Sequence, residues 1–435
     1  MNTKNKELFL KNINDYFGKY ADRYIELMNE SVRSAFFLNE KKASRDEIFE
    51  LIDFKYEGSS LTNKSFYYLD NSIGKSKAYE LGLIYPQDIE SSLPTTFIDT
   101  DNIRMAIDLC AAPGGKSINI LNRLNDDVLY IANDINYKRA LILKNNLERL
   151  GLDAIVTSNK IEYYRDNFKG LFDLVILDVP CSGEGMIRKY PEILDEYSDE
   201  NIDALSYKQE ILLDEAYELL NEGGKLLYST CTYAYKEDED QIIKFLNKHQ
   251  DMKLIELPKL DNINKLNGTI KLSPLNDTEG QFMALLIKDG HPSIKEYKYY
   301  KQIKNDLVKK FIKDNLIIDD YYLYNIKDDY YLSLKPLIKI DYNILNYGIY
   351  LGQIKNNRFE PAHNLYRSNS LKGKYKYVYE LNLKEYDDFI SGKELKISDD
   401  DNYYLLTYKN HSLGFGKLSK GILKNKYPKG LRRVV

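Results

Sequence analysis

The residues of this sequence best suited to chemistry are its three cysteines. Each lies in its own short motif, and the motifs read Asp108-Leu-Cys-Ala-Ala-Pro-Gly-Gly-Lys-Ser117, Asp178-Val-Pro-Cys-Ser-Gly-Glu-Gly185 and Tyr228-Ser-Thr-Cys-Thr232. Successive cysteines are 71 and 50 positions apart, no Cys-x-x-Cys pair occurs, and the chain has only 4 histidines. This spacing argues against a zinc site and against a disulfide framework. We therefore expect at least one thiol to act chemically, without a metal.

The first motif contains a glycine-rich loop that follows an apolar strand and precedes a helix. In open α/β sheets, ligands bind at this carboxyl end of the first strand. The loop is not a Walker A motif, which needs Gly where Cys110 stands, and the Gly-x-Gly-x-x-Gly fingerprint is absent. The residues predicted to hold the ligand are Cys110, Ala111, Ala112, Pro113, Gly114, Gly115 and Lys116.

Asp134 narrows the choice of ligand. It lies 20 residues past Gly114, at the end of the next predicted strand. A carboxylate there accepts hydrogen bonds from ribose hydroxyl groups. A nucleoside ligand that is not rich in phosphate fits best, which predicts S-adenosylmethionine as the cofactor. The competing interpretation is a structural turn followed by a helix-capping Asp134.

The other two cysteines belong at the same edge of the predicted sheet. Cys181 follows the apolar run 174–177, and Cys231 ends the run 225–229. A buried cysteine is often only structural, but two at a ligand-binding edge, one beside Asp178, favour chemistry. A thiol near S-adenosylmethionine suits methylation of a pyrimidine at C5, because C5 of cytosine becomes nucleophilic only after a thiolate adds at C6. An ordinary thiol, with a pKa near ~8.5, is only partly ionised at neutral pH, so Asp178 could assist by activating N3 of the base.

The elements that must position these residues alternate between strands and helices. The clearest helix is 137–150, which should end at Gly151 with a left-handed C-cap. Strands separated by helices indicate a doubly wound, Rossmann-like parallel sheet. The predicted strands are 105–109, 128–132, 154–157, 174–177, 225–229 and 282–288.

We expect three regions joined by one linker. Residues 1–100 begin with a helical pattern and form an α-rich accessory region, and residues 101–290 form the catalytic domain. Residues 291–305 are the linker, and residues 306–435 are a small, mostly β module. The last 25 residues contain seven Lys or Arg and no Asp or Glu, which suits either solvated surface or contact with nucleic acid.

Charge and hydropathy limit the partners and the location. The formal net charge of −4 means that a nucleic acid would be held by local basic patches and not by the overall field. No apolar stretch is long enough to cross a bilayer. We expect a cytoplasmic protein with reduced thiols, no membrane partner and a monomeric state.

Together, these motifs resemble the Nop/Sun-type RNA cytosine-C5 methyltransferases, and within them the bacterial ribosomal-RNA members. The three cysteine motifs are similar to that family's cofactor, proline-cysteine and threonine-cysteine motifs, in the same order. The resemblance extends to Tyr85-Pro-Gln-Asp88 with Ser91 and Ser92, to the run 134–139 and to the tail 421–432, and so covers nearly the whole chain.

The resemblance implies roles that spacing alone could not give. Cys231 would be the nucleophile that adds to C6, and Cys181 would assist release of the methylated product. Asp178 would bind the cofactor together with the glycine loop and Asp134, with Arg139 supporting that site. Many relatives carry Asp near the adenine where Asn159 stands here. The C-terminal module resembles a PUA-like RNA-binding appendage, and the N-terminal region would be an accessory RNA-binding region.

Several alternatives remain open at this point. A DNA cytosine-C5 methyltransferase would use Cys181 alone as its nucleophile and would leave Cys231 unexplained. A tRNA would be the substrate in place of 16S ribosomal RNA or the small ribosomal subunit. A non-catalytic RNA-binding ribosome-assembly factor on a methyltransferase scaffold would have no chemical need for Asp178, Cys181 and Cys231 together.

Overall fold

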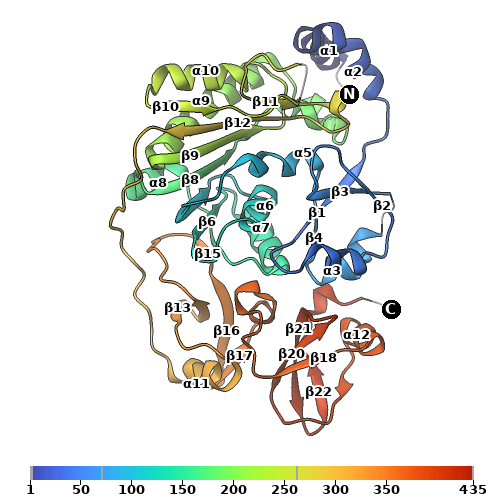
Figure 1. Ribbon diagram of the computed structural model, residues 1–435, viewed down its shortest axis with the longest axis vertical. Helices are drawn as coiled ribbons and strands as arrows, with labels where there is room; N and C mark the ends of the chain where they lie inside the picture. Colours follow the sequence, from blue (N-terminus) through green and yellow to red (C-terminus); the bar gives the residue numbers. More distant parts are fainter. Residues whose placement is uncertain (1–2, 70–71, 261–262, 434–435) are drawn as a thin grey trace.

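A nine-stranded sheet forms the centre of the molecule in the computed structural model, which describes residues 3–69, 72–260 and 263–433 (Figure 1). The strand order is β10-β12-β9-β8-β5-β6-β7-β15, and β11 pairs with β12. Strands β9, β8, β5, β6 and β7 run parallel, whereas β10, β11, β12 and β15 are antiparallel to their neighbours. The predicted Rossmann-like class is confirmed.

The bounds of the central strands follow the predicted runs closely. The main difference is β9, which begins at Leu220, five residues before the predicted start at Lys225. The strands are β5 (Met105–Asp108), β6 (Leu129–Asn133), β7 (Ile155–Thr157), β8 (Phe172–Asp178), β9 (Leu220–Thr230), β10 (Met252–Ile255), β11 (Ile270–Leu272), β12 (Gln281–Lys288) and β15 (Ile344–Tyr347).

Helices cover both faces of this sheet, because successive residues of its buried strands point to opposite sides. Ala106 of β5 joins one hydrophobic core and Ile107 the other. The prediction for α7 is confirmed at both ends: the Asn136 side chain caps its first turn, and Gly151 closes it with φ of +72°. The helices are α6 (Gly115–Leu121), α7 (Tyr137–Leu150), α8 (Ile161–Phe168), α9 (Asp199–Leu219) and α10 (Glu239–Lys248).

The N-terminal region begins with helices, as expected, and then adds a four-stranded sheet that the sequence pattern did not reveal. Helices α1 (Thr3–Phe17) and α2 (Ala21–Leu27) pack against Tyr197 and Tyr233 of the catalytic domain. The sheet has the order β2-β3-β1-β4. Its elements are β1 (Ser34–Leu38), β2 (Tyr56–Gly58), β3 (Ser65–Tyr68), β4 (Ile84–Pro86), α3 (Arg45–Glu50), α4 (Lys77–Glu80) and α5 (Ile89–Ser92).

The C-terminal part contains two small sheets and one strand of the central sheet. Residues 289–304, all within the described chain, contain neither helix nor strand. Strand β15, from the predicted module, pairs with β7 and covers the edge of the catalytic sheet. The first small sheet has the order β13-β14-β16-β17, beside α11. Its elements are α11 (Asp306–Asn315), β13 (Tyr322–Ile326), β14 (Asp329–Ser333), β16 (Ile349–Lys355) and β17 (Arg358–Pro361).

The second small sheet, order β18-β20-β21-β22-β19, lies beside the N-terminal region (Figure 1). The buried Arg367 side chain joins the three parts, since it donates to the carbonyls of Leu413, Glu80 and Arg149 at 3.0, 2.8 and 2.7 Å. None of the helices in the described ranges is both long and apolar enough to span a membrane. The remaining elements are β18 (Val378–Glu380), α12 (Leu383–Ile390), β19 (Leu395–Lys396), β20 (Tyr403–Tyr408), β21 (His411–Ser419) and β22 (Ile422–Asn425).

Candidate active site

The glycine loop lies at the carboxyl end of β5 and leads into α6. Gly114 has φ of +120°, a backbone conformation that residues with a side chain rarely adopt. A Cβ on Gly115 would lie 2.6 Å from the Gln87 side-chain nitrogen, so the N-terminal region approaches this loop closely. Gly114 therefore permits an unusual backbone conformation, and Gly115 permits the close approach of Gln87.

A cavity of about 400 Å³ opens above this loop. Its volume falls within the roughly 300–1,000 Å³ typical of small-molecule sites. One wall comes from the catalytic domain and includes Asp108, Cys110, Ala111, Ala112, Pro113, Gly115, Lys116 and Asp178. The other wall comes mainly from the N-terminal region and includes Ser34, Ala35, Tyr68, Tyr85, Gln87, Asp88 and Ser91, together with Lys189 and Tyr190. The N-terminal region thus completes the cavity, which the sequence did not predict.

Asp178 connects this cavity with the strand that leads to Cys231. One of its oxygens lies 2.8 Å from the Lys116 ammonium nitrogen, and the other accepts a hydrogen bond of 2.7 Å from the Ser229 hydroxyl. Lys116 is buried, so its charge needs such a partner. The pair gives the cavity one carboxylate that is held in place yet partly open to solvent.

Asp108 is a second carboxyl group in the cavity wall, and it lies deeper. Its Oδ2 accepts a hydrogen bond of 2.7 Å from Ser117, while its buried Oδ1 has no partner among the described atoms. Burial is the main cause that raises the pKa of Asp108 to about 7, and the Asp178 charge adds to it. The cavity therefore contains a carboxyl group that can carry a proton near neutral pH.

Asp134 binds the backbone of the glycine loop. Its Oδ2 accepts the Ala112 N–H at 3.3 Å and its Oδ1 accepts the Asn136 N–H at 2.9 Å. Arg139 lies 3.4 Å from the same carboxylate and donates to the Ala112 carbonyl at 2.6 Å. Gly114, Asp134, Arg139 and Asn159 are not among the residues that line the cavity. The contact of Asp134 with a ribose stays a prediction.

Asn159 is bound by residues of β6 and of the segment before β15. Its side-chain amide donates to the Tyr342 carbonyl at 3.0 Å, in the segment that leads into β15. Its backbone N–H and carbonyl are bound by Asn133 at 2.8 and 3.0 Å. The structure thus gives Asn159 a role in attaching the added strand, and its predicted contact with adenine stays a prediction.

The two remaining cysteines meet at the ends of β8 and β9. Their sulfur atoms are 3.2 Å apart, and the Cys231 N–H donates to Cys181 Sγ at 3.3 Å. The Cys231 thiol beside it, together with burial, raises the pKa of Cys181 well above the ordinary value. The Cys181 thiol is therefore protonated at neutral pH. Burial likewise raises the pKa of Cys110, and its thiol is far from reactive.

Sequence reasoning missed two buried glutamates beside these thiols. Glu184 is 1 % exposed and Glu237 is fully buried. Burial is the main cause that raises the pKa of both, to about 7 for Glu237. Glu184 lies within the quoted motif around Cys181, but Glu237 opens an acidic run, 237–240, that is typical of solvated surface. Only the position of this run after a strand end could have indicated otherwise.

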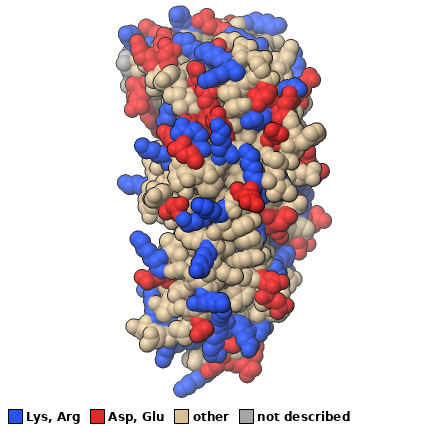
Figure 2. Space-filling view, turned by 90° about the vertical axis from the view of Figure 1, so that its left-hand side faces the viewer, with Lys and Arg blue, Asp and Glu red and all other residues tan. Residues whose placement is uncertain are grey.

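The basic side chains of the last 25 residues, here called the basic tail, are of two kinds: some are exposed, and others bind another part of the chain. Arg433 pairs with Glu80 at 2.5 Å and donates to the Gly74 carbonyl at 3.1 Å, so it attaches the tail to the N-terminal region. On the face shown in Figure 2, basic and acidic side chains are interspersed, as the small net charge suggests. The basic side chains of the tail that remain exposed are Lys417, Lys420, Lys424, Lys426 and Lys429.

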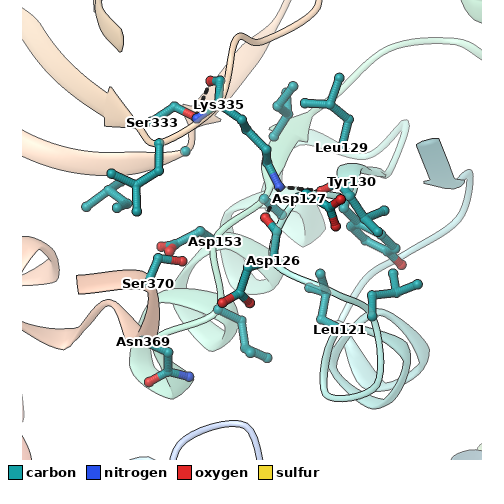
Figure 3. Close-up of a pocket in the computed structure, with 18 of the residues that line it drawn as sticks. Leu121, Asp126, Asp127, Leu129, Tyr130, Asp153, Ser333, Lys335, Asn369 and Ser370 are labelled. Carbon is teal, nitrogen blue, oxygen red and sulfur yellow. Dashed lines mark hydrogen bonds between the residues drawn. The ribbon is translucent and has the colours of Figure 1, made fainter. Parts of the chain in front are cut away.

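A second cavity, of about 320 Å³, lies between the catalytic sheet and the C-terminal part (Figure 3). Lys335 reaches across it from the end of β14 and donates to the carbonyls of Asp126, at 2.7 Å, and Val128. Ser368 donates to Asp153 at 2.7 Å beside it. Leu121, Tyr130, Asn369 and Ser370 complete this part of the lining. Its lining contains no cysteine and none of the predicted site residues, so the candidate active site is the first cavity with the adjoining thiols.

The fold and this site define a Rossmann-like methyltransferase with an added C-terminal β module. Comparison with protein families agrees: residues 95–287 match the family described as 16S rRNA methyltransferase RsmB/F. Residues 376–433 match the family described as the methyltransferase RsmF PUA domain.

Individual relatives extend this similarity over most of the chain. The ribosomal RNA small subunit methyltransferase F of Psychromonas ingrahamii is 27 % identical over 397 residues, which are 83 % of this chain and 81 % of the relative. The tRNA (cytosine(49)-C(5))-methyltransferase of Pyrococcus abyssi is 32 % identical over 301 residues, 62 % of this chain and 96 % of that relative. A solved methyltransferase homolog from Pyrococcus horikoshii superimposes with a TM-score of 0.57 at 27 % identity, covering 65 % of this chain and 94 % of that one.

The chain belongs to the RsmB/F family of methyltransferases. The expected enzyme class, an RNA (cytosine-C5) methyltransferase, is confirmed by this membership. The resemblance noted from the cysteine motifs and the tail is confirmed as well.

Proposed function

We propose that this enzyme methylates C5 of cytosine in ribosomal RNA of the small subunit, through a covalent bond between Cys231 and C6 of the base. The observation that carries the mechanism is the pair of sulfur atoms 3.2 Å apart at neighbouring strand ends. A DNA-type enzyme that uses Cys181 alone would have no need for the second thiol. A non-catalytic protein on a methyltransferase scaffold would need neither the two thiols nor the Lys116–Asp178 ion pair.

In this proposal the two thiols take different roles. The Cys231 thiolate adds to C6, which makes C5 nucleophilic, and C5 then accepts the methyl group. The C5 proton passes to a water molecule, which restores the aromatic ring and expels the Cys231 thiolate. Cys181, protonated and adjacent, assists this expulsion. Asp178 interacts with N3 of the base during attack, and the base must leave any stack to reach the thiols.

S-adenosylmethionine is the proposed cofactor, and it supplies the methyl group when bound. The cavity above the glycine loop has a suitable volume, and the buried, unpartnered Asp108 oxygen gives it a polar floor. The loop 110–116 and Asp178 would hold the cofactor. Asp134 would accept from the ribose hydroxyls, Arg139 would fix Asp134, and Asn159 would contact the adenine.

Ribosomal RNA is favoured over tRNA by the extent of the similarity. The similarity to the ribosomal RNA methyltransferase extends over 83 % of the chain, whereas that to the tRNA methyltransferase ends after 62 %. The match to an RsmF PUA domain over residues 376–433 adds to this preference. In the proposal, regions 1–100 and 306–435 bind RNA beside the catalytic domain 101–290, and a monomer acts in the cytoplasm.

Bisulfite sequencing of ribosomal RNA tests the target directly. Ribosomal RNA from cells lacking the gene should lose 5-methylcytosine at one or more positions, and the wild-type gene should restore it. Restoration by the wild type but not by a Cys231→Ala variant would tie the mark to this site. Unchanged ribosomal RNA with loss of the mark in tRNA would replace the proposed substrate.

A further inference from the structure

Each cysteine loop supplies a buried glutamate to the other loop. Glu184 follows Cys181 by three residues, and its Oε2 accepts the Tyr233 N–H at 3.0 Å. The same oxygen accepts the Thr232 hydroxyl at 2.8 Å. Glu237 follows Cys231 by six residues, and its Oε2 accepts the Ser182 N–H at 3.0 Å. The hydrogen bonds therefore run in both directions between the loops.

Shorter links reinforce the same junction. The Ser182 and Thr232 hydroxyl groups are 2.7 Å apart, and the Gly185 N–H donates to the Cys231 carbonyl at 3.0 Å. A Cβ on Gly185 would lie 2.9 Å from that carbonyl and 2.4 Å from Gly280 Cα, so the loops are in full contact. Residues beyond the ends of β8 and β9 have left the ladder of the sheet, and these bonds replace it.

Full burial makes the two carboxyl groups costly unless they are bound. A buried acceptor without a donor is unfavourable, so each carboxyl group favours the geometry in which its Oε2 is bound. The other oxygen of Glu237, Oε1, has no partner among the described atoms. Gln209 strengthens the arrangement, because its amide donates both to Glu237 Oε2, at 2.8 Å, and to the Pro180 carbonyl, at 3.0 Å. The loop that carries Cys181 is thereby attached to α9 as well.

We propose that Glu184 and Glu237 are positioning residues, whose reciprocal hydrogen bonds between the two loops hold Cys181 Sγ against Cys231 Sγ. The catalytic consequence rests on the proposed function, since only a reaction that uses both thiols needs them adjacent. The geometric claim stands on its own, because the distance between the thiols can be measured without RNA.

Cross-linking by diamide measures that adjacency. Diamide takes up the two thiol hydrogens and is reduced to the hydrazine, while the two sulfur atoms form a disulfide. In the full-length protein, the rate of the Cys181–Cys231 cross-link is followed by peptide mass spectrometry, and a peptide without cysteine serves as the internal reference. Glu184→Ala and Glu237→Ala should each slow the cross-link at least tenfold. Glu237→Gln should stay within threefold of the wild type, because its amide oxygen still accepts the Ser182 N–H.

The matched control is Glu215→Gln, on the same helix as Gln209. Its carboxylate is also largely buried, but it pairs with Arg165 at 2.6 Å, so its loss should leave the cross-linking rate unchanged. Thr232→Val removes the hydroxyl that bonds Glu184 and Ser182, and it covers the case in which an alanine variant fails to fold. It should slow the cross-link at least threefold. Wild-type rates in the folded alanine and valine variants would overturn the proposal, as would equal slowing by Glu215→Gln.

Single-turnover methyl transfer to RNA then tests the consequence. Glu184→Ala and Glu237→Ala should lower the rate of methyl transfer at least tenfold, while the dissociation constant of the cofactor changes less than twofold. Glu237→Gln should show the wild-type rate of methyl transfer. A slowed cross-link with unaltered methyl transfer would overturn the positioning role. If the wild-type protein methylated no RNA but the cross-linking differences held, the proposed function would fail and the loop geometry would stand.

Discussion

The edge of the sheet that carries the thiols and the basic tail differ in how their functional groups are held. At the sheet edge, Asp178, Cys181 and Cys231 are fixed by contacts with groups from neighbouring strand ends and from α6. In the tail, Lys424 and Lys426 extend into solvent from β22 and the loop after it. The first arrangement gives defined distances between the thiols and the carboxylate, and the second gives only a local concentration of charge.

This difference predicts how each region responds to mutation. Covalent chemistry requires reacting atoms to be held within a few tenths of an ångström, and buried hydrogen bonds supply that rigidity. Electrostatic attraction to a phosphate backbone needs no such fit, since mobile charges that release counterions suffice. Changes at the sheet edge should therefore have large, position-specific effects, and changes in the tail should have small, additive ones.

The largest effect is expected from the thiols themselves. Cys231→Ala should form no covalent adduct and show no detectable turnover, because it lacks the nucleophile. Cys181→Ala should methylate once and stay attached to the RNA, and Cys110→Ala should retain activity. A denaturing gel after incubation with RNA and S-adenosylmethionine detects the adduct as a shifted band. A shifted band with Cys231→Ala and none with Cys181→Ala would exchange the two roles.

Asp134→Ala should have the next largest effect, on cofactor affinity. Loss of charge-assisted hydrogen bonds to the ribose should weaken binding by about 1.5–3 kcal/mol, roughly ten- to hundredfold in the dissociation constant. Calorimetry measures this directly. Asp134→Asn, which keeps an acceptor for the Ala112 N–H, should lose less. An unchanged affinity in Asp134→Ala would remove this residue from the site.

Glu237 at the sheet edge should make stability depend on pH. Burial raises its pKa from an ordinary 4.5 to about 7, so the folded protein binds this proton more tightly than the unfolded chain. The free energy of unfolding should therefore fall as the pH rises from about 4.5 to 7, by up to about 3 kcal/mol from this group. In Glu237→Gln this part of the slope should be missing.

Urea unfolding between pH 5 and pH 8 measures that slope. Glu210→Gln, which changes an exposed carboxylate on α9, is the control and should reproduce the wild-type slope. A Glu237→Gln slope equal to that of the wild type would mean that the carboxyl group titrates like an exposed one. The contrast between a buried junction and a solvated tail would then lose one of its supports.

The smallest effect per residue is expected in the tail. Changing Lys417, Lys420, Lys424, Lys426 and Lys429 to glutamine should weaken RNA binding and lower the slope of log affinity against log salt, by about 0.7 for each lost contact with single-stranded RNA. Arg433→Gln should instead lower stability and leave that slope unchanged, because Arg433 pairs with Glu80. An unchanged slope in the lysine variant would mean that these side chains are only solvated surface.

Deletion of the tail is a poorer experiment. Removing residues 416–435 would take away the end of β21 and all of β22, besides the anchor at Arg433. Residues 434 and 435 lie outside the described part of the chain. Loss of RNA binding in such a variant would not separate charge from folding, whereas glutamine substitutions keep the strands.

The central sheet was predictable because its information is local. Buried parallel strands are continuous apolar runs, and α7 is bounded by a capping Asn136 and by Gly151. The four-stranded N-terminal sheet was not predictable in the same way. Its strands are three to five residues long, and β2 is exposed throughout, so no periodic pattern could develop.

For the site, the sequence determined which groups are present and at which edge of the sheet they lie. Asp178 ends β8, Cys181 and Cys231 follow the ends of β8 and β9, and parallel strands end on the same side. Distances between groups 50 residues apart depend on how neighbouring strands are ordered and how their loops bond, and only the tertiary structure decided them. The tertiary structure places the two sulfur atoms 3.2 Å apart. It also buries Glu237, although this residue belongs to an acidic run in the sequence. Such contacts produce no periodic pattern in the sequence, because each side chain binds a partner that is distant along the chain.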